Sequence, residues 1–295
     1  VNGGMFDCAP PLCPTPLMQS AAFEAALRAC GQRPVRLSCG TLMLRRKVAG
    51  LPVAMLPRAV LSDPARTLSL ARKVTRAPLL ISPARPADLS LYGALPLISP
   101  AQQAVISLNA DPDVMRGHLH GKWRNRLKHA EKAGLRVQHH PMPRRTDHWL
   151  LQADVAQQRT RRYRNWPVPL TLGFAATTPR AAILFEAFQG ADPVAALLIL
   201  RHGDTATYHI GHTTAAGRAA SAHTLLMWTA MCWCARHGHH WLDLGLVDTR
   251  HTAGLARFKL GTGAQVMPLG GTWLHWPPLQ PLRRLTWLDR RMMTP

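Results

Sequence analysis

The stretch TATYHIGHTTAAGRAASAHTLLMWTAMCWCARHGHHWLDLGLVDTRHTAGLARFKLGTGAQVMPLGG, residues 205–271, decides the fold. Its first residues are β-branched or aromatic and predict a strand at 205–211. Apolar side chains all round residues 222–237 predict a buried helix that ends at Gly238. A second strand at 241–246, a short helix and a last strand follow. Strand, helix and strand at this spacing predict a right-handed crossover, and hence an α/β fold with a mixed or parallel sheet.

The loop between the first strand and the buried helix, residues 213–221, is a candidate anion site. Gly217 and its small neighbours allow a ligand close to the backbone, and Ser221 is the predicted N-cap of the helix. Unpaired amides and the helix dipole favour a phosphate there, and Arg218 would add a guanidinium. An ordinary strand-to-helix turn also needs a small residue and a cap, so both interpretations stay open.

Hydrophobic periodicity predicts the remaining elements. It indicates helices at 19–30, 111–133 and 146–162, and another over TPRAAILFEAFQG at 178–190. PVAALLILR, the turn His202-Gly203-Asp204 and TATYHIGH predict a hairpin that leads into the anion-site loop. The helix at 111–133 has an apolar stripe and a basic face, which is either a solvated surface or a track for phosphates.

The order of the predicted elements and three short segments resemble one family. The order strand, small-residue loop, helix, strand is similar to the acyl-carrier-binding core of the GNAT acyltransferase superfamily. GLARFKLGTGA, residues 254–264, resembles the Phe-Lys signature of its FemAB-like branch, and KWRNRLKHAEKAGLRV, residues 122–137, resembles the basic helix of that branch. The aspartate pair in WLDLGLVD is a third match. The loop at 216–220 is thinner in glycine and arginine than the typical GNAT pyrophosphate loop.

The resemblance implies a GNAT-like mixed sheet flanked by helices, in two GNAT-like lobes of which the first is degenerate. We expect an irregular arm at 1–14, the degenerate lobe at 15–109, the acyltransferase lobe at 110–275 and a basic tail at 276–295. It also implies acetyl-CoA or another acyl-CoA as co-substrate. The candidate residues for binding it are Gly211, Gly217, Arg218 and Ser221.

Acyl transfer to an amine needs a base, donors for the oxyanion and a proton for the leaving group. The catalytic candidates are Asp243 in the predicted strand, Asp248 just past its end, and Lys259 of the Phe-Lys signature. Glu186 and His212 are further base candidates. For the acceptor we name Lys122, Arg126 and His212. Each aspartate can instead be a turn residue, and the lysine an exposed one.

The composition limits the classes of function. Lys and Arg number 36 against 15 Asp and Glu, a net charge of +21 that favours polyanions such as tRNA, anionic surfaces or phosphate-bearing cofactors. A genome-wide bias toward arginine and alanine would give the same net charge without any functional reason. The six cysteines form no Cys-x-x-Cys pair and no metal site is expected. The opening residues lack the features of a secretory signal and no window suits a membrane span, so we expect a cytoplasmic protein.

Three functions follow, in this order. The first is transfer of an acyl group from acyl-CoA to an amine of a small molecule, an amino sugar or a cell-envelope precursor. The second is FemAB-like transfer of an amino acid from aminoacyl-tRNA, which the charge and the thinned loop favour. The third is a non-catalytic basic module that binds nucleic acid or an anionic surface. The acceptor and the oligomeric state are left open.

Overall fold

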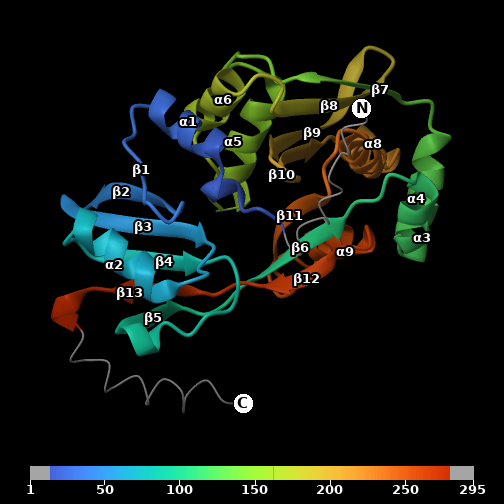
Figure 1. Cartoon of the computed structure of the whole chain (residues 1–295). Helices are drawn as coiled ribbons and strands as arrows, with labels where there is room; N and C mark the ends of the chain where they lie inside the picture. Colours follow the sequence, from blue (N-terminus) through green and yellow to red (C-terminus); the bar gives the residue numbers. More distant parts are fainter. Residues whose placement is uncertain (1–13, 162, 280–295) are drawn as a thin grey trace, which may run out of the picture.

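Two mixed β-sheets organise the chain, and helices cover them (Figure 1). The structure is a computed structural model that describes residues 14–161 and 163–279. The larger sheet has the order β12-β6-β11-β10-β9-β8-β7, in which β10 and β11 run parallel and the other neighbours antiparallel. Its strands are β6 (Gln102–Ser107), β7 (Arg136–Pro141), β8 (Ala182–Gln189), β9 (Asp192–His202), β10 (Thr205–Thr213), β11 (Trp241–Val247) and β12 (Gln265–Pro268).

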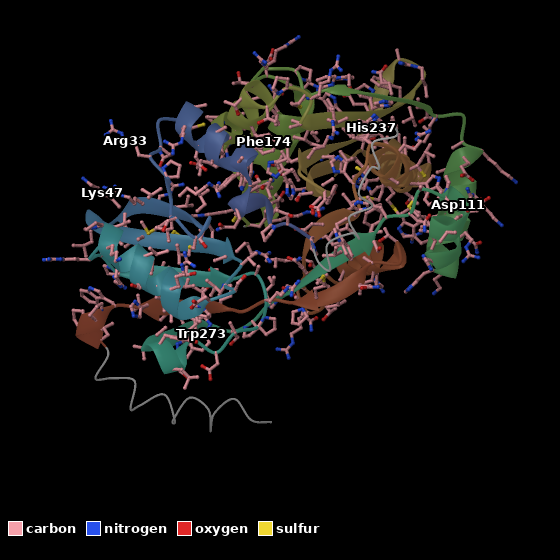
Figure 2. The ribbon with its side chains drawn as sticks, viewed as in Figure 1. Arg33, Lys47, Asp111, Phe174, His237 and Trp273 are labelled. Atoms are coloured by element: carbon pink, nitrogen blue, oxygen red, sulfur yellow. The ribbon has the colours of Figure 1, made fainter. Side chains whose placement is uncertain are left out.

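Helices bury both faces of this larger sheet. Leu197 of β9 packs in one apolar cluster with residues of α4 (Gly121–Glu131) and α8 (Ala222–Arg236). Its neighbour Leu198 packs in another with Phe174 and other residues of the helices on the opposite face, α1 (Ala21–Ala29), α5 (Trp149–Arg161) and α6 (Val168–Thr177) (Figure 2). Because successive side chains of a strand point to opposite faces, β9 needs an uninterrupted apolar run.

The smaller sheet has the order β1-β2-β3-β4-β13-β5. Its strands are β1 (Val35–Arg36), β2 (Leu42–Val48), β3 (Leu51–Ala59), β4 (Leu79–Pro83), β5 (Ala94–Ile98) and β13 (Thr272–His275), and α2 (Pro64–Val74) covers it. Leu68 and Ala71 of α2 pack on Leu56 and Ile81 of the sheet. β3 and β4 are parallel, whereas β13 pairs antiparallel with both β4 and β5. The red β13 therefore lies among the blue and cyan strands in Figure 1.

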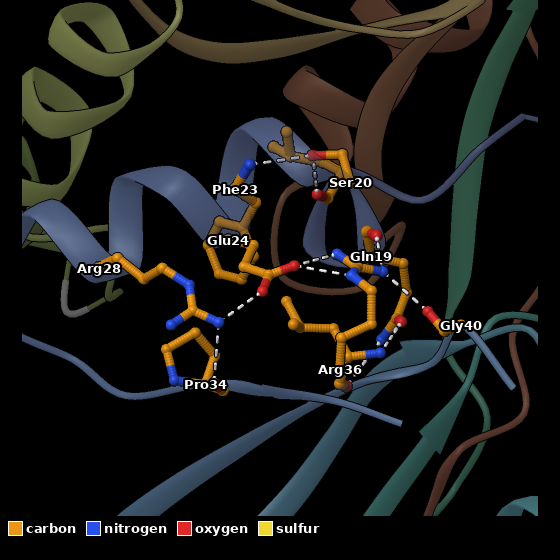
Figure 3. A network of polar contacts seen from close by, with 10 residues as sticks. Gln19, Ser20, Phe23, Glu24, Arg28, Pro34, Arg36 and Gly40 are labelled. Carbon is orange, nitrogen blue, oxygen red and sulfur yellow. Dashed lines mark hydrogen bonds and ion pairs between the residues drawn. The ribbon is translucent and has the colours of Figure 1, made fainter. Parts of the chain in front are cut away.

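A polar network joins α1 to the smaller sheet (Figure 3). The Ser20 hydroxyl accepts the Phe23 amide at 3.1 Å and so caps α1. Glu24 forms ion pairs with Arg28 and Arg36, which are 2.8 and 2.6 Å away. Arg36 also donates to the carbonyl oxygen of Gly40, so the start of the smaller sheet is tied to the helix.

The predicted elements of residues 205–271 are confirmed. The order is β10, α8, β11, α9 (Ala253–Gly261) and β12, with a short helix α7 (Ala215–Ala219) inside the predicted loop. β10 and β11 pair in parallel, and the predicted α/β class with mixed sheets is confirmed. The cause is the sequence pattern, since α8 is apolar all round and is buried against β8, β9 and β10.

The helix predicted at 178–190 is wrong. These residues form β8, whose first six residues are all buried. A short apolar run suits a strand buried on both faces as well as a helix, and here the strand is covered on both sides. The helix lies just before it, as α6, which begins directly after Pro167.

The single helix predicted at 111–133 is two helices, α3 (Pro112–His118) and α4. Leu119 and His120 have extended backbones and separate them, and the His120 amide donates to the carbonyl oxygen of Gly261. The predicted apolar stripe of Leu119, Trp123, Leu127 and Ala130 is nevertheless buried. The stripe survives the break because α4 keeps the helical spacing from Trp123 onward.

The division at residue 109 remains a prediction. β6 precedes that boundary but belongs to the larger sheet, and β13 follows it but belongs to the smaller sheet. The predicted arm, residues 1–14, lies outside the described residues except for Pro14, and the predicted tail, 276–295, lies outside them from residue 280.

Candidate active site

A large cavity lies where β10 and β11 separate. The two strands pair only from Thr205–Thr207 to Trp241–Asp243, and the register of β11 on β6 then shifts. The cavity, about 1350 Å³, is lined by the carboxyl halves of both strands, the start of α8, α9, and residues of the smaller sheet. Ligands of α/β proteins usually bind at such strand ends.

Asp243 and Lys259 face this cavity together. Asp243 Oδ1 accepts the Gly245 amide at 2.7 Å. Burial raises the pKa of Asp243, an effect that the Gly245 amide, Arg58 and Lys259 partly offset. Lys259, 6% exposed, donates from Nζ to the carbonyl oxygen of Leu246 at 2.7 Å. Burial lowers its pKa to about 8, although Asp243 opposes the change. The lysine is therefore buried beside the aspartate, and the interpretation as an exposed lysine is wrong.

The predicted anion-site loop uses much of its polar capacity internally. The Gly217 amide donates to Thr214 Oγ1 at 3.1 Å, and a Cβ at Gly217 would lie 2.2 Å from the carbonyl oxygen of Val194. Glycine is thus required here by packing against β9. Arg218 Nη1 donates to the carbonyl oxygen of Thr213 at 2.8 Å. The loop therefore offers a pyrophosphate one backbone donor fewer than the sequence predicted, whereas Arg218 uses one of its five N–H donors in this bond.

Ser221 is the N-cap residue of α8, but not in the predicted way. Its φ is 52°, and its side chain accepts no hydrogen bond from the first turn. It lines the cavity, as do Gly217 and Arg218. The structure therefore brings Gly217, Arg218 and Ser221 to one cavity. The predicted capping role of the Ser221 side chain is wrong, because the backbone of Ser221 is left-handed.

A tyrosine–histidine pair occupies the space beside Gly211. The Tyr208 hydroxyl lies 3.1 Å from His223 Nε2, and a Cβ at Gly211 would lie 1.9 Å from that hydroxyl. Burial lowers the pKa of His223 to about 4 and that of His212 below its usual range. His212 packs edge-on against Trp149 and lines the cavity with the pair. Both histidines are therefore neutral near pH 7.

Three other predicted site residues, Arg126, Lys122 and Asp248, lie in different surroundings. Arg126 lines the cavity, whereas Lys122 is exposed on α4 and is not among the lining residues. Asp248 lies at the rim, where its Oδ1 accepts the amides of Arg250 and His251; these bonds lower its pKa. It acts there as a turn residue.

Glu186 lies away from the cavity. Its carboxylate accepts the Trp149 indole N–H at 2.8 Å and lies 3.0 Å from His140 Nε2. It is buried on β8 and not among the cavity residues, so it is not placed to act as the base.

Sequence reasoning missed Arg58, Gln103 and the buried Asp154. Arg58 of β3 and Gln103 of β6 both line the cavity and are joined by a hydrogen bond of 2.6 Å. Asp154 of α5 accepts the Tyr163 hydroxyl at 2.9 Å. The sequence offered one sign of a buried polar residue, which was Asp154 on an otherwise apolar face of α5. Nothing in the sequence around Arg58 indicated a role in the site.

Basic side chains dominate the cavity, and they come from both sheets and their helices. The lining has the three aspartates Asp154, Asp243 and Asp248 against seven basic residues: Arg58, Arg85, Arg126, Arg161, Arg164, Arg218 and Lys259. Across the described ranges, no group of three or more His, Cys, Asp or Glu is arranged to hold a metal ion. Nor does any helix of these ranges have the length and apolar character needed to cross a membrane.

Residues 119–264 match the family described as "Acetyltransferase (GNAT) domain". The structure of FemX is similar over 91% of this chain and 94% of its own, with a TM-score of 0.74 and 13% identity. The C-terminal domain of a putative lysylphosphatidylglycerol synthetase from Agrobacterium fabrum has a TM-score of 0.53 at 13% identity, over 88% of this chain and 87% of its own. L-PGS from Bacillus licheniformis has 0.52 at 13%, over 92% and 95%.

No curated protein sequence matches the chain. At these identities the structural likeness is one of fold, and together with the family match it supports an enzyme of the N-acyltransferase type. Residues 119–264 therefore form a GNAT acetyltransferase domain, and the chain as a whole has a fold similar to that of FemX. The two helix-flanked sheets agree with the pair of GNAT-like lobes that the resemblance implied.

Proposed function

We propose that this protein transfers an aminoacyl group from aminoacyl-tRNA to the amine of a small molecule or a cell-envelope precursor. One observation carries the choice of donor. The Gly217 amide, which would face a coenzyme pyrophosphate, already donates to Thr214 Oγ1, and Arg218 donates one of its five N–H groups to the carbonyl oxygen of Thr213. The FemAB-like resemblance implies a tRNA donor instead.

The basic lining of the cavity supports the same donor. Arg161 and Arg164, at and after the end of α5, line the cavity with Tyr163, which is 37% exposed. Arginines that neutralise phosphates and an aromatic side chain that stacks on a base suit a single-stranded nucleic-acid end. Such an end is where tRNA carries its amino acid.

The chemistry follows from the residues that meet in the cavity. The acceptor amine attacks the ester carbonyl carbon, a C–N bond forms, and the bond to the ribose oxygen breaks. Asp243, whose pKa burial raises, takes the amine proton, and the Lys259 ammonium stabilises the oxyanion of the tetrahedral intermediate. The Tyr208 hydroxyl, bonded to His223, gives a proton to the leaving oxygen and regains one from solvent.

Acyl-CoA remains the second candidate donor, because the strands β10 and β11 separate at the start of α8 as a ligand slot would require. A non-catalytic basic module is the third, and it predicts binding without transfer.

The test compares the two donors directly. Wild type, Arg161→Ala and Arg33→Ala are titrated with aminoacyl-tRNA at several salt concentrations, and transfer of a labelled amino acid to an amine is followed. Arg161 is exposed at the cavity, whereas Arg33 is exposed in the loop between α1 and β1, at the left edge of the molecule in Figure 2. We expect the affinity of wild type for aminoacyl-tRNA to fall steeply with salt concentration. The slope of the logarithm of the binding constant against the logarithm of the salt concentration should be smaller in magnitude by about one in Arg161→Ala and unchanged in Arg33→Ala.

The opposite result is equally clear. Saturable stabilisation by acetyl-CoA that is lost in Arg218→Ala, without tRNA-dependent transfer, would refute the proposal in favour of acyl-CoA. Arg218 is chosen because any side chain at Gly217 would clash with β9 whatever ligand binds.

A further inference from the structure

Arg58 adopts a backbone conformation that residues other than glycine rarely adopt. Its φ is 49°, in the left-handed region, and only Ala49, Arg180 and Ser221 share this feature among the described non-glycine residues. Of the four, Arg58 and Ser221 line the cavity. Strained backbone of this kind persists where the surroundings hold it, and it is concentrated at functional sites.

The residues on either side of Arg58 are held in place. The carbonyl oxygen of Pro57 accepts Gln19 Nε2 at 2.5 Å, and the carbonyl oxygen of Ala59 accepts the Ala84 amide at 2.9 Å. Gln19 is itself fixed in the network that joins the first helices to the smaller sheet (Figure 3). The register of β3 on β4 shifts within this segment. The strained turn is therefore built at the carboxyl end of a parallel strand pair.

The turn presents a cation to the larger sheet. Arg58 Nη1 donates to Oε1 of Gln103, which is 8% exposed on β6. This is the one hydrogen bond of the guanidinium with the described part of the chain, where it also forms no ion pair within 4.0 Å. Burial lowers the pKa of Arg58, an effect that the charge of Asp243 partly offsets. A guanidinium has five N–H donors, so most of them remain for a ligand.

We propose that Arg58 binds an anionic group, a phosphate or carboxylate, of the acceptor and so holds the acceptor amine beside Asp243. This inference rests on the proposed function for the amine, but the anion site itself does not depend on the donor. Arg85, just past β4, lines the same cavity and adds a second cation. Guanidinium groups bind both kinds of oxyanion through paired hydrogen bonds. The smaller sheet thus recognises the acceptor.

Arg58→Gly is the informative variant, because glycine accepts a φ of 49° without strain. Arg180→Gly is its matched control, since Arg180 has a φ of 59° but is exposed and not among the cavity residues. Calorimetric titrations with inorganic phosphate and, separately, acetate are made without any donor. We expect wild type to bind at least one probe, with the dissociation constant at least tenfold higher in Arg58→Gly and unchanged in Arg180→Gly.

Arg58→Lys should bind the same probe with intermediate affinity, because it keeps the charge but not the fork. The probe that binds identifies the anionic group as phosphate or carboxylate. Equal affinity in wild type and Arg58→Gly, or no binding of either probe to wild type, overturns the proposal. Because no tRNA is present, failure of the aminoacyl donor would leave these titrations unaffected.

Discussion

Replacing Lys259 by methionine should make the protein more stable at neutral pH. The lysine is 6% exposed, and burial lowers its pKa from 10.5 to about 8. The unfolded chain holds the proton more tightly than the folded chain, so burial of the ammonium opposes folding wherever the group is charged. Methionine has a similar length and no charge, and it packs well in irregular spaces.

The expected gain follows from the two pKa values. At pH 7 a change from 10.5 to about 8 corresponds to a cost of about 3 kcal/mol for the buried charge. Loss of the hydrogen bond to the Leu246 carbonyl oxygen offsets about 1 kcal/mol, because Leu246 is 53% exposed and water can replace the lysine. The net gain for Lys259→Met is therefore about 2 kcal/mol.

The pH dependence has a definite sign. Between the folded pKa near 8 and the unfolded value of 10.5, the unfolded chain binds more protons, so wild-type stability rises with pH. The advantage of Lys259→Met should shrink by about 2 kcal/mol between pH 7 and pH 9.5. Urea unfolding at both pH values measures it, with Lys122→Met, at an exposed lysine, as the control for loss of one positive charge.

A difference between wild type and Lys259→Met that stays constant from pH 7 to pH 9.5 would refute the reasoning, because it would mean that the lysine is charged equally in both states. The same variant removes the cation beside Asp243, so transfer should fall although the fold is more stable.

Other variants test the packing and charge of the site. Gly211→Ala should cost about 2 kcal/mol in urea unfolding because its Cβ would lie 1.9 Å from the Tyr208 hydroxyl, and adding Tyr208→Phe should recover part of that loss. Gly217→Ala should cost about 3 kcal/mol, with or without donor present, because its Cβ meets the carbonyl oxygen of Val194; an undiminished melting temperature would contradict this. Burial lowers the pKa of His209 from 6.5 to about 3, so stability should fall as the pH drops below 6.5, and His209→Gln should lose about 2.5 kcal/mol less than wild type by pH 4.5.

The sequence predicted the fold best where the pattern within one segment distinguishes a helix from a strand. Residues 222–237 are apolar all round, which leaves a buried helix as the solution, and β10 and β11 flank it as expected. Residues 182–189 are a continuous apolar run that suits either a helix or a strand buried on both faces. Only the helices on the two faces of the sheet, which come from distant segments, decide between them.

The candidate site was predictable only in part, for a related reason. Asp243 and Lys259 lie close together in a stretch with a recognisable pattern, and the structure brings both to one cavity. Arg58 comes from β3 of the smaller sheet, and Gln103 comes from β6, the first strand of the larger sheet along the chain. Their role depends on how the sheets meet, and no local spacing records that.

The position of β13 has a consequence for synthesis. This strand, Thr272–His275, fills the place between β4 and β5. In the growing chain β4 ends at residue 83 and β5 at residue 98, whereas β13 begins only at residue 272. Until it leaves the ribosome, the facing edges of β4 and β5 have no partner strand. The first sheet is therefore finished last, and a fragment that stops before residue 272 should expose two unpaired strand edges rather than behave as an independent domain.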